Sequence, residues 1–545
     1  MTHYIATTFA PVQGFIEKSR KLRDLFGSSL ILSYLSQQII NAAQAANCQI
    51  ISPGSPDLTQ GLPNRILIKG DFPEAASREA LLDGWRRLLD ECQIWIEERI
   101  HDVHYTWQRD WELWRNHTWE IFWGTGTSVT AAMNDLERGK LSRDWSAVNW
   151  IGESSSLSGT DAIAWPGLGA PSRNPKSLRH QDEKQQIDEF YQKLAAILEG
   201  KSPQEQAAGK FLDPSERISI PELVKRLVTH PQIAQRIDPN FPKLESNFSD
   251  IIRLPDPETQ SPGRWTGWFM GDGDKVGDHL KQLTEAADPD QALHDFSQAM
   301  RDWGKQFETQ FPDDLGRIIY AGGDDFLGVI YDGRTALTAT DLTDSTKSLK
   351  TRQLAWLKEL PKCWETHGQN IGVSVGFVWA GHSVPQRDIL QHCRESEKRS
   401  KSLGRHRVTL RVVFNSGQFV QWTCPWDYLV LLDLYCDRNG EQNWGHLYND
   451  MAQLKARHAL QTRPLSEENQ AETDADATLA IGLANLYFQP KLNDSELTDT
   501  AVSAGEVGDY LFTQRETLTH SQTHQAFINW FDELVSIGWY LAHRS

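Results

Sequence analysis

Residues 265–280 (WTGWFMGDGDKVGDHL) and residues 317–332 (RIIYAGGDDFLGVIYD) each contain an apolar run that leads into glycines and aspartates. Two adjacent glycines between β-rich runs are typical of a hairpin. We therefore expect Asp324 and Asp325 at the hairpin tip or on the first residues of its return strand. Asp272 is expected at the end of a strand that precedes a helix. If these strands are neighbours in one sheet, their carboxylates converge on one edge.

Converging carboxylates repel one another unless a cation lies between them. Hard divalent ions such as Mg²⁺ take oxygen ligands and often bridge carboxylates to substrate phosphates. Two such ions can stabilise the attacking and leaving oxygens of an in-line phosphoryl transfer. The alternative is an acidic surface hairpin with no chemical role. The second Asp-Gly-Asp, at residues 272–274, favours the metal-dependent interpretation.

Two other interpretations of residues 271–277 fail, one because a glycine is misplaced and the other because a ligand is missing. The glycines do not match the dinucleotide-binding fingerprint, because the third one, Gly277, is misplaced. Asp272 and Asp274 begin like a calcium loop, but an EF-hand needs a further ligand where this chain has Val276.

The composition is that of a globular protein. The chain has 545 residues, 39% of them hydrophobic, which is enough for roughly three or four domains. No apolar run reaches the length of about 18 residues that a membrane span needs, and no signal peptide is visible. The six cysteines form no C-x-x-C motif, so we expect neither a disulfide framework nor a zinc site, and a cytoplasmic location.

The net charge of −18 argues against a surface that binds nucleic acid throughout. It leaves open a local basic groove or a role inside a larger assembly. A basic cluster at Lys18, Arg20, Lys21 and Arg23 is either the solvated face of an amphipathic helix or a contact with RNA phosphates or a partner subunit.

The first half of the chain mixes strand and helix patterns. Residues 3–9 and 65–69 predict strands, and residues 75–123 and 181–235 predict mainly helices. The tryptophans between residues 107 and 123 are expected to pack in a core or an interface rather than to stack on bases. Residues 152–186, rich in Ser, Gly and Pro, predict a long loop or inter-domain segment.

From residue 264 to about 415 the pattern is strand, helix, strand, strand, helix, strand, helix, strand. The first six elements match the βαββαβ ferredoxin-like order, which is also the order of polymerase and cyclase palms. The last strand is expected at residues 408–414. Beyond residue 417 the pattern predicts helices, with an acidic and mobile connector at residues 465–477.

Two basic residues follow the last predicted helix of this palm. Lys401 near the helix end and Arg405 beyond it could reach a triphosphate held by the acidic pair. Lys401 would act as a compact positive charge, and the guanidinium of Arg405 could donate two parallel hydrogen bonds to phosphate oxygens. The alternative is a basic helix end that complements the helix dipole.

Motifs in the N-terminal region and in the palm resemble those of one known family. Residues 11–16 (PVQGFI), 20–25 (RKLRDL) and 28–35 (SSLILSYL) resemble the N-terminal signature of the polymerase-like large subunit of type III-B CRISPR effector complexes, the Cmr branch of the Cas-ten family. Residues 271–274 (GDGD) resemble its first palm-strand motif, and residues 322–325 its GGDD signature. Residues 400–405 (SKSLGR) resemble the A-K-x-x-G-R segment shared with GGDEF cyclases. The resemblance spans residues 1 to about 415.

The resemblance implies an α+β fold with two ferredoxin-like palm (GGDEF/cyclase-like) domains and with helical inter-palm and C-terminal domains. The implied parts are a first, non-catalytic palm with a helical insertion (1–150), a linker and helical inter-palm domain (151–260), a catalytic GGDD palm (261–416) and a C-terminal helical domain (417–545).

The resemblance also implies an activity in antiviral defence. Such a subunit converts ATP to cyclic oligoadenylate second messengers by metal-assisted nucleotidyl transfer when target RNA pairs with the guide RNA. The implied partners are the other subunits of the complex, guide RNA, target RNA and ATP, with no membrane. The implied catalytic residues are Asp272, Asp324 and Asp325, which would hold Mg²⁺ or Mn²⁺, with Asp274 as a further metal candidate. The implied nucleotide-binding residues are Gly271, Gly273, Gly322, Gly323, Lys401 and Arg405.

The sequence departs from the family pattern in two places. Many members begin with an HD nuclease domain, whereas this chain starts at the first palm, so DNase activity is not expected. Many carry a cysteine-based zinc site between the palms, but residues 94–362 contain no Cys, which puts zinc in doubt.

Two alternative functions stay open. One is a catalytically silent scaffold subunit that binds guide and target RNA in the same complex. The other is a stand-alone diguanylate cyclase using GTP, although Asp325 stands where the GGDEF motif has glutamate.

Overall fold

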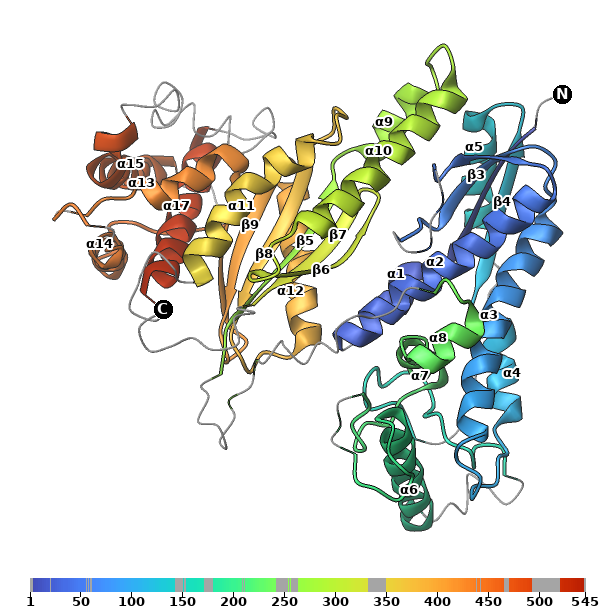
Figure 1. The fold of residues 1–545 in the computed structure, drawn as a ribbon. Helices are drawn as coiled ribbons and strands as arrows, with labels where there is room; N and C mark the ends of the chain where they lie inside the picture. The colour runs from blue at the N-terminus through green and yellow to red at the C-terminus, as the bar shows by residue number, and fades with distance from the viewer. Residues whose placement is uncertain are drawn as a thin grey trace. The chain divides into compact units, whose positions relative to one another are not determined.

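The computed structural model describes most of the chain (Figure 1). The described residues are 3–19, 21–54, 56, 58, 61–142, 150, 153–170, 180–207, 209, 211–241, 253, 255, 263–331, 349–437, 439–441, 443–464, 470–492 and 520–543. The chain divides into two compact units. The first contains Met1–Ile251, Gly277–Gln306 and Ile319–Gly323, and the second contains Ile252–Val276, Phe307–Ile318 and Asp324–Ser545.

The first unit contains a four-stranded antiparallel sheet in the order β2-β3-β1-β4. Helices follow the first and third strands in sequence, which gives the ferredoxin-like βαββαβ arrangement. The predicted strands at residues 3–9 and 65–69 are confirmed. The bounds are β1 Tyr4–Ala10, α1 Val12–Glu17, α2 Leu22–Ala45, β2 Gln49–Ser52, β3 Arg65–Lys69, α3 Glu74–Glu97, α4 Gln108–His117, β4 Glu120–Gly126 and α5 Val129–Leu141.

The helical prediction for residues 75–123 is wrong at its end. Strand β4 begins at Glu120 and pairs along its whole length with β1. Gly124 explains this locally, because a Cβ there would lie 2.2 Å from the backbone nitrogen of Leu136 on α5. The close packing of α5 on this segment favours a strand there, and the order of residues in the sequence does not reveal that packing. Trp107 and Trp111 are fully buried, which confirms core packing for these two tryptophans.

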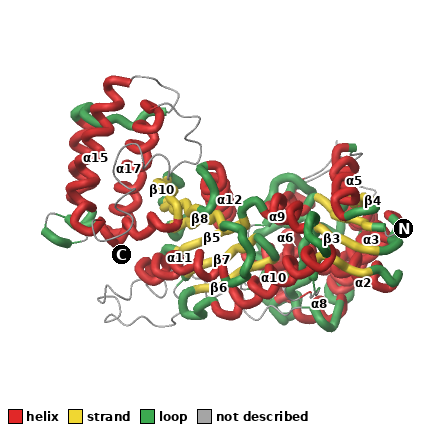
Figure 2. The backbone as a smooth tube through the Cα atoms, turned by 90° about the horizontal axis from the view of Figure 1, so that it is seen from above, coloured by secondary structure: helices red, strands yellow, loops and turns green. Residues whose placement is uncertain are grey.

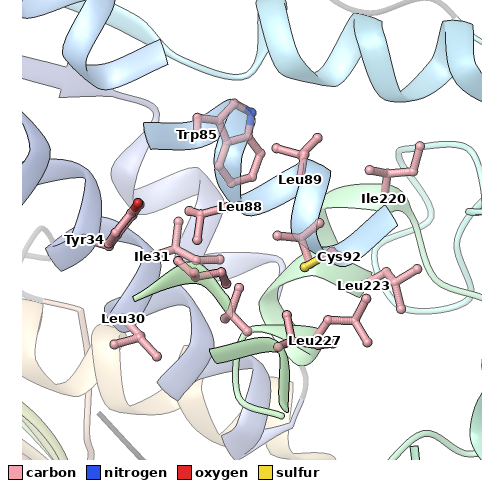
Figure 3. Close-up of a cluster of buried hydrophobic side chains, with 14 of the residues drawn as sticks. Leu30, Ile31, Tyr34, Trp85, Leu88, Leu89, Cys92, Ile220, Leu223 and Leu227 are labelled. Atoms are coloured by element: carbon pink, nitrogen blue, oxygen red, sulfur yellow. The ribbon is translucent and has the colours of Figure 1, made fainter. Parts of the chain in front are cut away.

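The core of the first unit lies between α2, α3 and α7 (Figure 3). The labelled apolar side chains come from all three helices and face one another: Leu30, Ile31, Tyr34, Trp85, Leu88, Leu89, Cys92, Ile220, Leu223 and Leu227. The region between the palms contributes α6 His180–Leu198, α7 Ile220–Leu227 and α8 Pro231–Ile237. Residues 153–170 contain turns and two isolated β-bridges, in line with the loop predicted at 152–186, but that prediction is wrong from His180 onward, where α6 begins; residues 151–152 and 171–179 lie outside the described residues.

The basic cluster near the N-terminus contacts acidic and polar groups of the same unit. Lys18 pairs with Asp161 and Lys21 with Glu216. Arg23 is buried and donates to the hydroxyl of Thr229 at 3.1 Å. These three cations are therefore partnered within the chain; Arg20 lies outside the described residues.

The second sheet has six strands in the order β10-β9-β8-β5-β7-β6. Its β8-β5-β7-β6 part is again ferredoxin-like, and β9 is added in parallel beside β8. The predicted α+β class with two palm folds and helical regions is therefore confirmed. The bounds are β5 Thr266–Gly273, α9 Val276–Leu283, α10 Pro289–Gln310, β6 Gly316–Gly322, β7 Asp325–Ile330, α11 Leu349–Glu365, β8 Val373–Ala380, α12 Gln386–Ser402, β9 Arg407–Val413 and β10 Phe419–Pro425.

Strand β10 corrects the expectation that the sheet ends at residue 414. Residues 414–418 form a tight turn in which Gly417 has φ of +82° and its amide donates to the carbonyl of Phe414. The chain then returns antiparallel to β9. The C-terminal helix covers this strand, with Trp530 donating to the carbonyl of Thr423 at 2.8 Å.

The remaining elements are helical. They are η3 Trp426–Val430, α13 Leu431–Leu434, α14 Gly445–Ala456, α15 Gln470–Leu492 and α17 His520–His543, and α15 and α17 lie side by side (Figure 2). The predicted mobile connector at 465–477 is wrong from Gln470 onward, where α15 begins; residues 465–469 lie outside the described residues. Among the described helices, none is long and apolar enough to cross a membrane.

Candidate active site

Two of the three central carboxylates lie on neighbouring strands of the second sheet, and the third lies in the turn between β6 and β7. Asp272, next to last in β5, is the register partner of Asp325, the first residue of β7. Asp324 occupies the turn before β7, and its carbonyl accepts a hydrogen bond from the backbone of Gly273 at 2.7 Å. Direct partners in an antiparallel pair present their side chains on the same face. The convergence expected from the sequence is present.

The surrounding glycines allow this close geometry. A Cβ at Gly271 would lie 2.1 Å from the ring of Phe326, and one at Gly273 would lie 3.2 Å from the Cβ of Asp324. Gly323 has φ of +82°, a left-handed conformation that a side chain would disfavour. Gly322 is the last residue of β6. Gly271, Gly273 and Gly323 therefore have structural reasons to be glycine, and a role of the four glycines in nucleotide binding stays a prediction.

Lys401 connects helix α12 to the carboxylates. Its ammonium donates to Asp272 and lies 2.6 Å from Glu397 Oε1, in an ion pair without hydrogen-bond geometry. Burial works to lower the pKa of Lys401, but the hydrogen bond to Asp272 and the negative charges of Asp272 and Glu397 outweigh it and raise that pKa. Lys401 is therefore a fixed positive charge beside Asp272.

Glu397 was missed in the sequence analysis. The available signal was its position four residues before Lys401 on a predicted helix, a spacing at which side chains of opposite charge meet. Burial, partly offset by Lys401, raises the pKa of Glu397. Glu397 shares one cation with Asp272.

The site carries more negative than positive charge. Burial raises the pKa of Asp272 against the opposing effect of Lys401. The protein packed around the Asp325 carboxyl, together with the charges of Asp324 and Asp272, raises the pKa of Asp325 well above its usual range. Asp325 is nevertheless exposed as a residue, so the site is open to solvent on one side. A cation or a proton relieves the repulsion among these groups.

Asp274 differs from its neighbours. Its residue is 7% exposed, and each carboxylate oxygen accepts a hydrogen bond at 2.7 Å, one from the hydroxyl of Ser374 and one from the backbone of His406. Arg405, the residue before His406, has an exposed side chain in a turn beyond the end of α12.

The carboxylates of the site are chemically suited to bind a hard cation. Asp272, Asp324 and Asp325 offer oxygen atoms only, which suits Mg²⁺ or Mn²⁺. Within the described residues, no group of three His, Cys, Asp or Glu side chains is already arranged to hold a metal ion. Lys401 bonds to Asp272 in this arrangement, so ion binding requires the site to rearrange.

Two segments of the chain match models of CRISPR-associated protein domains. Residues 266–409 match the second palm domain of Cas10/Cmr2, and residues 4–60 match the N-terminal region of the CRISPR-associated protein Cmr2. None of the curated proteins matches the chain.

The chain is also similar to solved structures at low sequence identity. The type III-B Cmr-beta complex in its apo state, solved by cryo-EM, contains a chain that is 11% identical, with a TM-score of 0.51 over 90% of this chain and 77% of that chain. Csm1 from T. onnurineus and a Csm1–Csm4 cassette in complex with cA4 are each 12% identical, with a TM-score of 0.45 over 100% of this chain and 70% of that chain. The two family-model matches, in the order expected from the sequence, identify Cas10/Cmr2-type domains at residues 4–60 and 266–409, in agreement with the two ferredoxin-like palms.

Proposed function

We propose that this chain is the large subunit of a type III CRISPR RNA-guided effector complex and converts ATP to cyclic oligoadenylates when target RNA pairs with the guide RNA. The observation that supports this most is the pairing of Asp272 with Asp325 across β5 and β7, with Lys401 beside them. We further propose other subunits of such a complex as its partners and the four-part division at residues 150, 260 and 416.

The proposed reaction joins one ATP to another. A ribose hydroxyl of the first attacks the α-phosphorus of the second, the bond to pyrophosphate breaks, and the hydroxyl proton leaves to solvent. Asp272, Asp324 and Asp325 would hold Mg²⁺ or Mn²⁺, which lowers the pKa of the attacking hydroxyl and neutralises charge on the phosphates.

The chain's own residues bind and orient the triphosphate. Lys401 donates a hydrogen bond to Asp272 in the ligand-free site, and its ammonium would be available to a phosphate if Asp272 served as a metal ligand. Glu397 keeps Lys401 at the site during this exchange. The exposed guanidinium of Arg405 can donate two parallel hydrogen bonds to phosphate oxygens.

The substrate proposal rests on this site. Solved Csm1–Csm4 cassettes contain one ATP or cA4, but that is a property of those proteins. In this chain, a carboxylate set that suits Mg²⁺ lies beside Lys401, with Arg405 in the turn beyond the same helix, and such a combination is expected for a nucleoside triphosphate.

The direct test is the double variant Asp324→Asn/Asp325→Asn. Without the two carboxylates the metal ions and the developing charge lose their ligands, and ATP turnover by the assembled complex should fall by at least about 100-fold. The matched control is Asp313→Asn/Asp314→Asn, an exposed Asp-Asp pair just before β6. Turnover retained in the first variant, or lost equally in the control, contradicts the assignment.

A further inference from the structure

Asp274 lies two residues from Asp272, yet its surroundings differ. Its side chain is buried, and its two oxygens are each used by a donor from the chain, Ser374 on β8 and the backbone of His406. Its own backbone amide donates to the carbonyl of Gly372 at 2.8 Å. Asp274 therefore joins three segments: the end of β5, the start of β8 and the turn between α12 and β9.

The turn that Asp274 holds has an unusual backbone. Gly404, Arg405 and His406 have φ of +131°, +65° and +48°. Lys275, adjacent to Asp274, has φ of +55°. Three of the five non-glycine residues with positive φ in the described chain thus lie around this carboxylate, the other two being Asn47 and His458. Such conformations cost free energy and persist only where the surrounding contacts impose them.

Close packing at Gly372 and two further hydrogen bonds also hold the turn of residues 404–406. A Cβ at Gly372 would lie 3.0 Å from Nδ1 of His406 and 3.2 Å from Oδ2 of Asp274. The backbone of Arg405 donates to the carbonyl of Ser400 at 3.1 Å, and the hydroxyl of Ser400 donates to the carbonyl of Val375 at 2.9 Å. The turn is thus tied both to α12, which carries Lys401, and to the sheet.

We propose that Asp274 is a positioning residue that locks the turn of residues 404–406 and thereby directs Arg405 toward the triphosphate, instead of ligating the metal ion. The proposal rests on the proposed function for the identity of the triphosphate. Both oxygens of Asp274 already accept hydrogen bonds, whereas Asp325 faces like charges. The metal would then be held by Asp272, Asp324 and Asp325.

Replacing Asp274 by Asn or by Ala distinguishes a positioning role from a role as a metal ligand. An asparagine can accept from the amide of His406 through its carbonyl oxygen and donate to the hydroxyl of Ser374 through its NH₂ group. It therefore keeps the turn in place but is a poor substitute for a carboxylate ligand. An alanine removes both bonds and leaves the strained turn without its acceptor.

The experiment compares Asp274→Asn, Asp274→Ala and Asp324→Asn in the full chain. ATP turnover by the assembled complex should stay within about fivefold of the original in Asp274→Asn, because the hydrogen bonds are retained. It should fall by about 100-fold in Asp274→Ala, because Arg405 is misplaced. Mn²⁺ affinity, measured by calorimetry without nucleotide, should be unchanged in Asp274→Asn and lowered in Asp324→Asn.

Hydrogen exchange supplies a readout that does not depend on activity. The amide of His406 should be protected in the original chain and in Asp274→Asn, and should exchange faster in Asp274→Ala while the strands β5 and β8 stay protected. Loss of Mn²⁺ affinity in Asp274→Asn to the level of Asp324→Asn, or unchanged exchange at His406 in Asp274→Ala, would overturn the proposal. Absence of ATP turnover in the original complex would refute the proposed function alone, and exchange at His406 would still decide the role of Asp274.

Discussion

Asp325 illustrates how a residue of the proposed active site can reduce stability. Its raised pKa means that ionisation is less favourable in the folded chain than in the unfolded one, where an aspartate has a pKa of about 3.9. The cost is therefore absent below that pH and complete above the folded-state pKa. We predict that Asp325→Asn raises the Tm of the metal-free chain more at pH 8 than at pH 5. Thermal unfolding at both pH values tests this; an equal gain or a loss contradicts it.

Lys401 is predicted to stabilise the ligand-free site as well as to bind phosphate. Lys401→Ala leaves Asp272 and Glu397 without their shared cation. We expect a lower Tm without metal, a larger rise in Tm on adding Mg²⁺ than in the original chain, and a higher KM for ATP. Lys398→Ala, which removes an exposed lysine of the same helix, is the control and should change none of these. A Mg²⁺ response identical to that of the original chain would exclude this role.

For single residues, the sequence predicts the position of those that lie at the end of a strand. The apolar runs predict Asp272 at a strand end and Asp325 at the hairpin tip or at the start of its return strand. Ser374 and Glu397 could not be assigned, because their contacts depend on the register of β8 against β5 and on how α12 lies on the sheet.

Helix α12 brings Lys401 to the carboxylates because it packs unusually close to β8. A Cβ at Gly376 would lie 2.4 Å from the carbonyl oxygen of Cys393 and 2.5 Å from the nitrogen of Glu397. We predict that Gly376→Ala displaces α12, lowers the free energy of unfolding by about 1–3 kcal/mol and reduces ATP turnover. The control is Gly277→Ala, since apart from its chain neighbours and the backbone of its own helix no atom lies within 4 Å of the Cβ position there. Denaturant unfolding and turnover are the measurements; equal effects of the two variants would contradict the packing argument.

Elements with strong periodic patterns could be predicted, whereas two short strands could not. The central βαββαβ order follows from alternating apolar runs and long helical segments. Strand β4 follows directly on a helical tryptophan pattern, and β10 depends on the turn at Gly417 and on cover from α17. Both strands are specified by tertiary contacts more than by local sequence.

At the scale of the molecule, a buried ion cluster joins α2 of the first palm to α7. Arg226 donates to the two oxygens of Asp24 at 2.9 and 3.0 Å and to Glu216 at 2.6 Å. Burial works to raise the pKa of Asp24, but Arg226 outweighs it and lowers that pKa. Asp24 lies in the N-terminal RKLRDL motif, so that motif has a structural reason in this chain.

Removing Asp24 should be costly, because Arg226 would stay buried without its main partner. We predict that Asp24→Ala lowers the free energy of unfolding by about 3–5 kcal/mol. The contribution of Asp24 is present above its unfolded pKa and is lost as the pH falls through its lower folded pKa. Urea unfolding at neutral and acid pH tests both statements. Glu74→Ala, which breaks an exposed pair with Arg78, should cost less than about 1 kcal/mol; a similar cost for both variants would contradict the argument.

The central claim is that target RNA switches on ATP conversion at the paired carboxylates of β5 and β7. The most direct test is mass spectrometry of the products formed from ATP and Mg²⁺ by the complex assembled with guide RNA, with and without matching target RNA. We predict cyclic oligoadenylates only when target RNA is present. No product despite tight binding of target RNA would contradict the claim and favour a catalytically silent scaffold subunit.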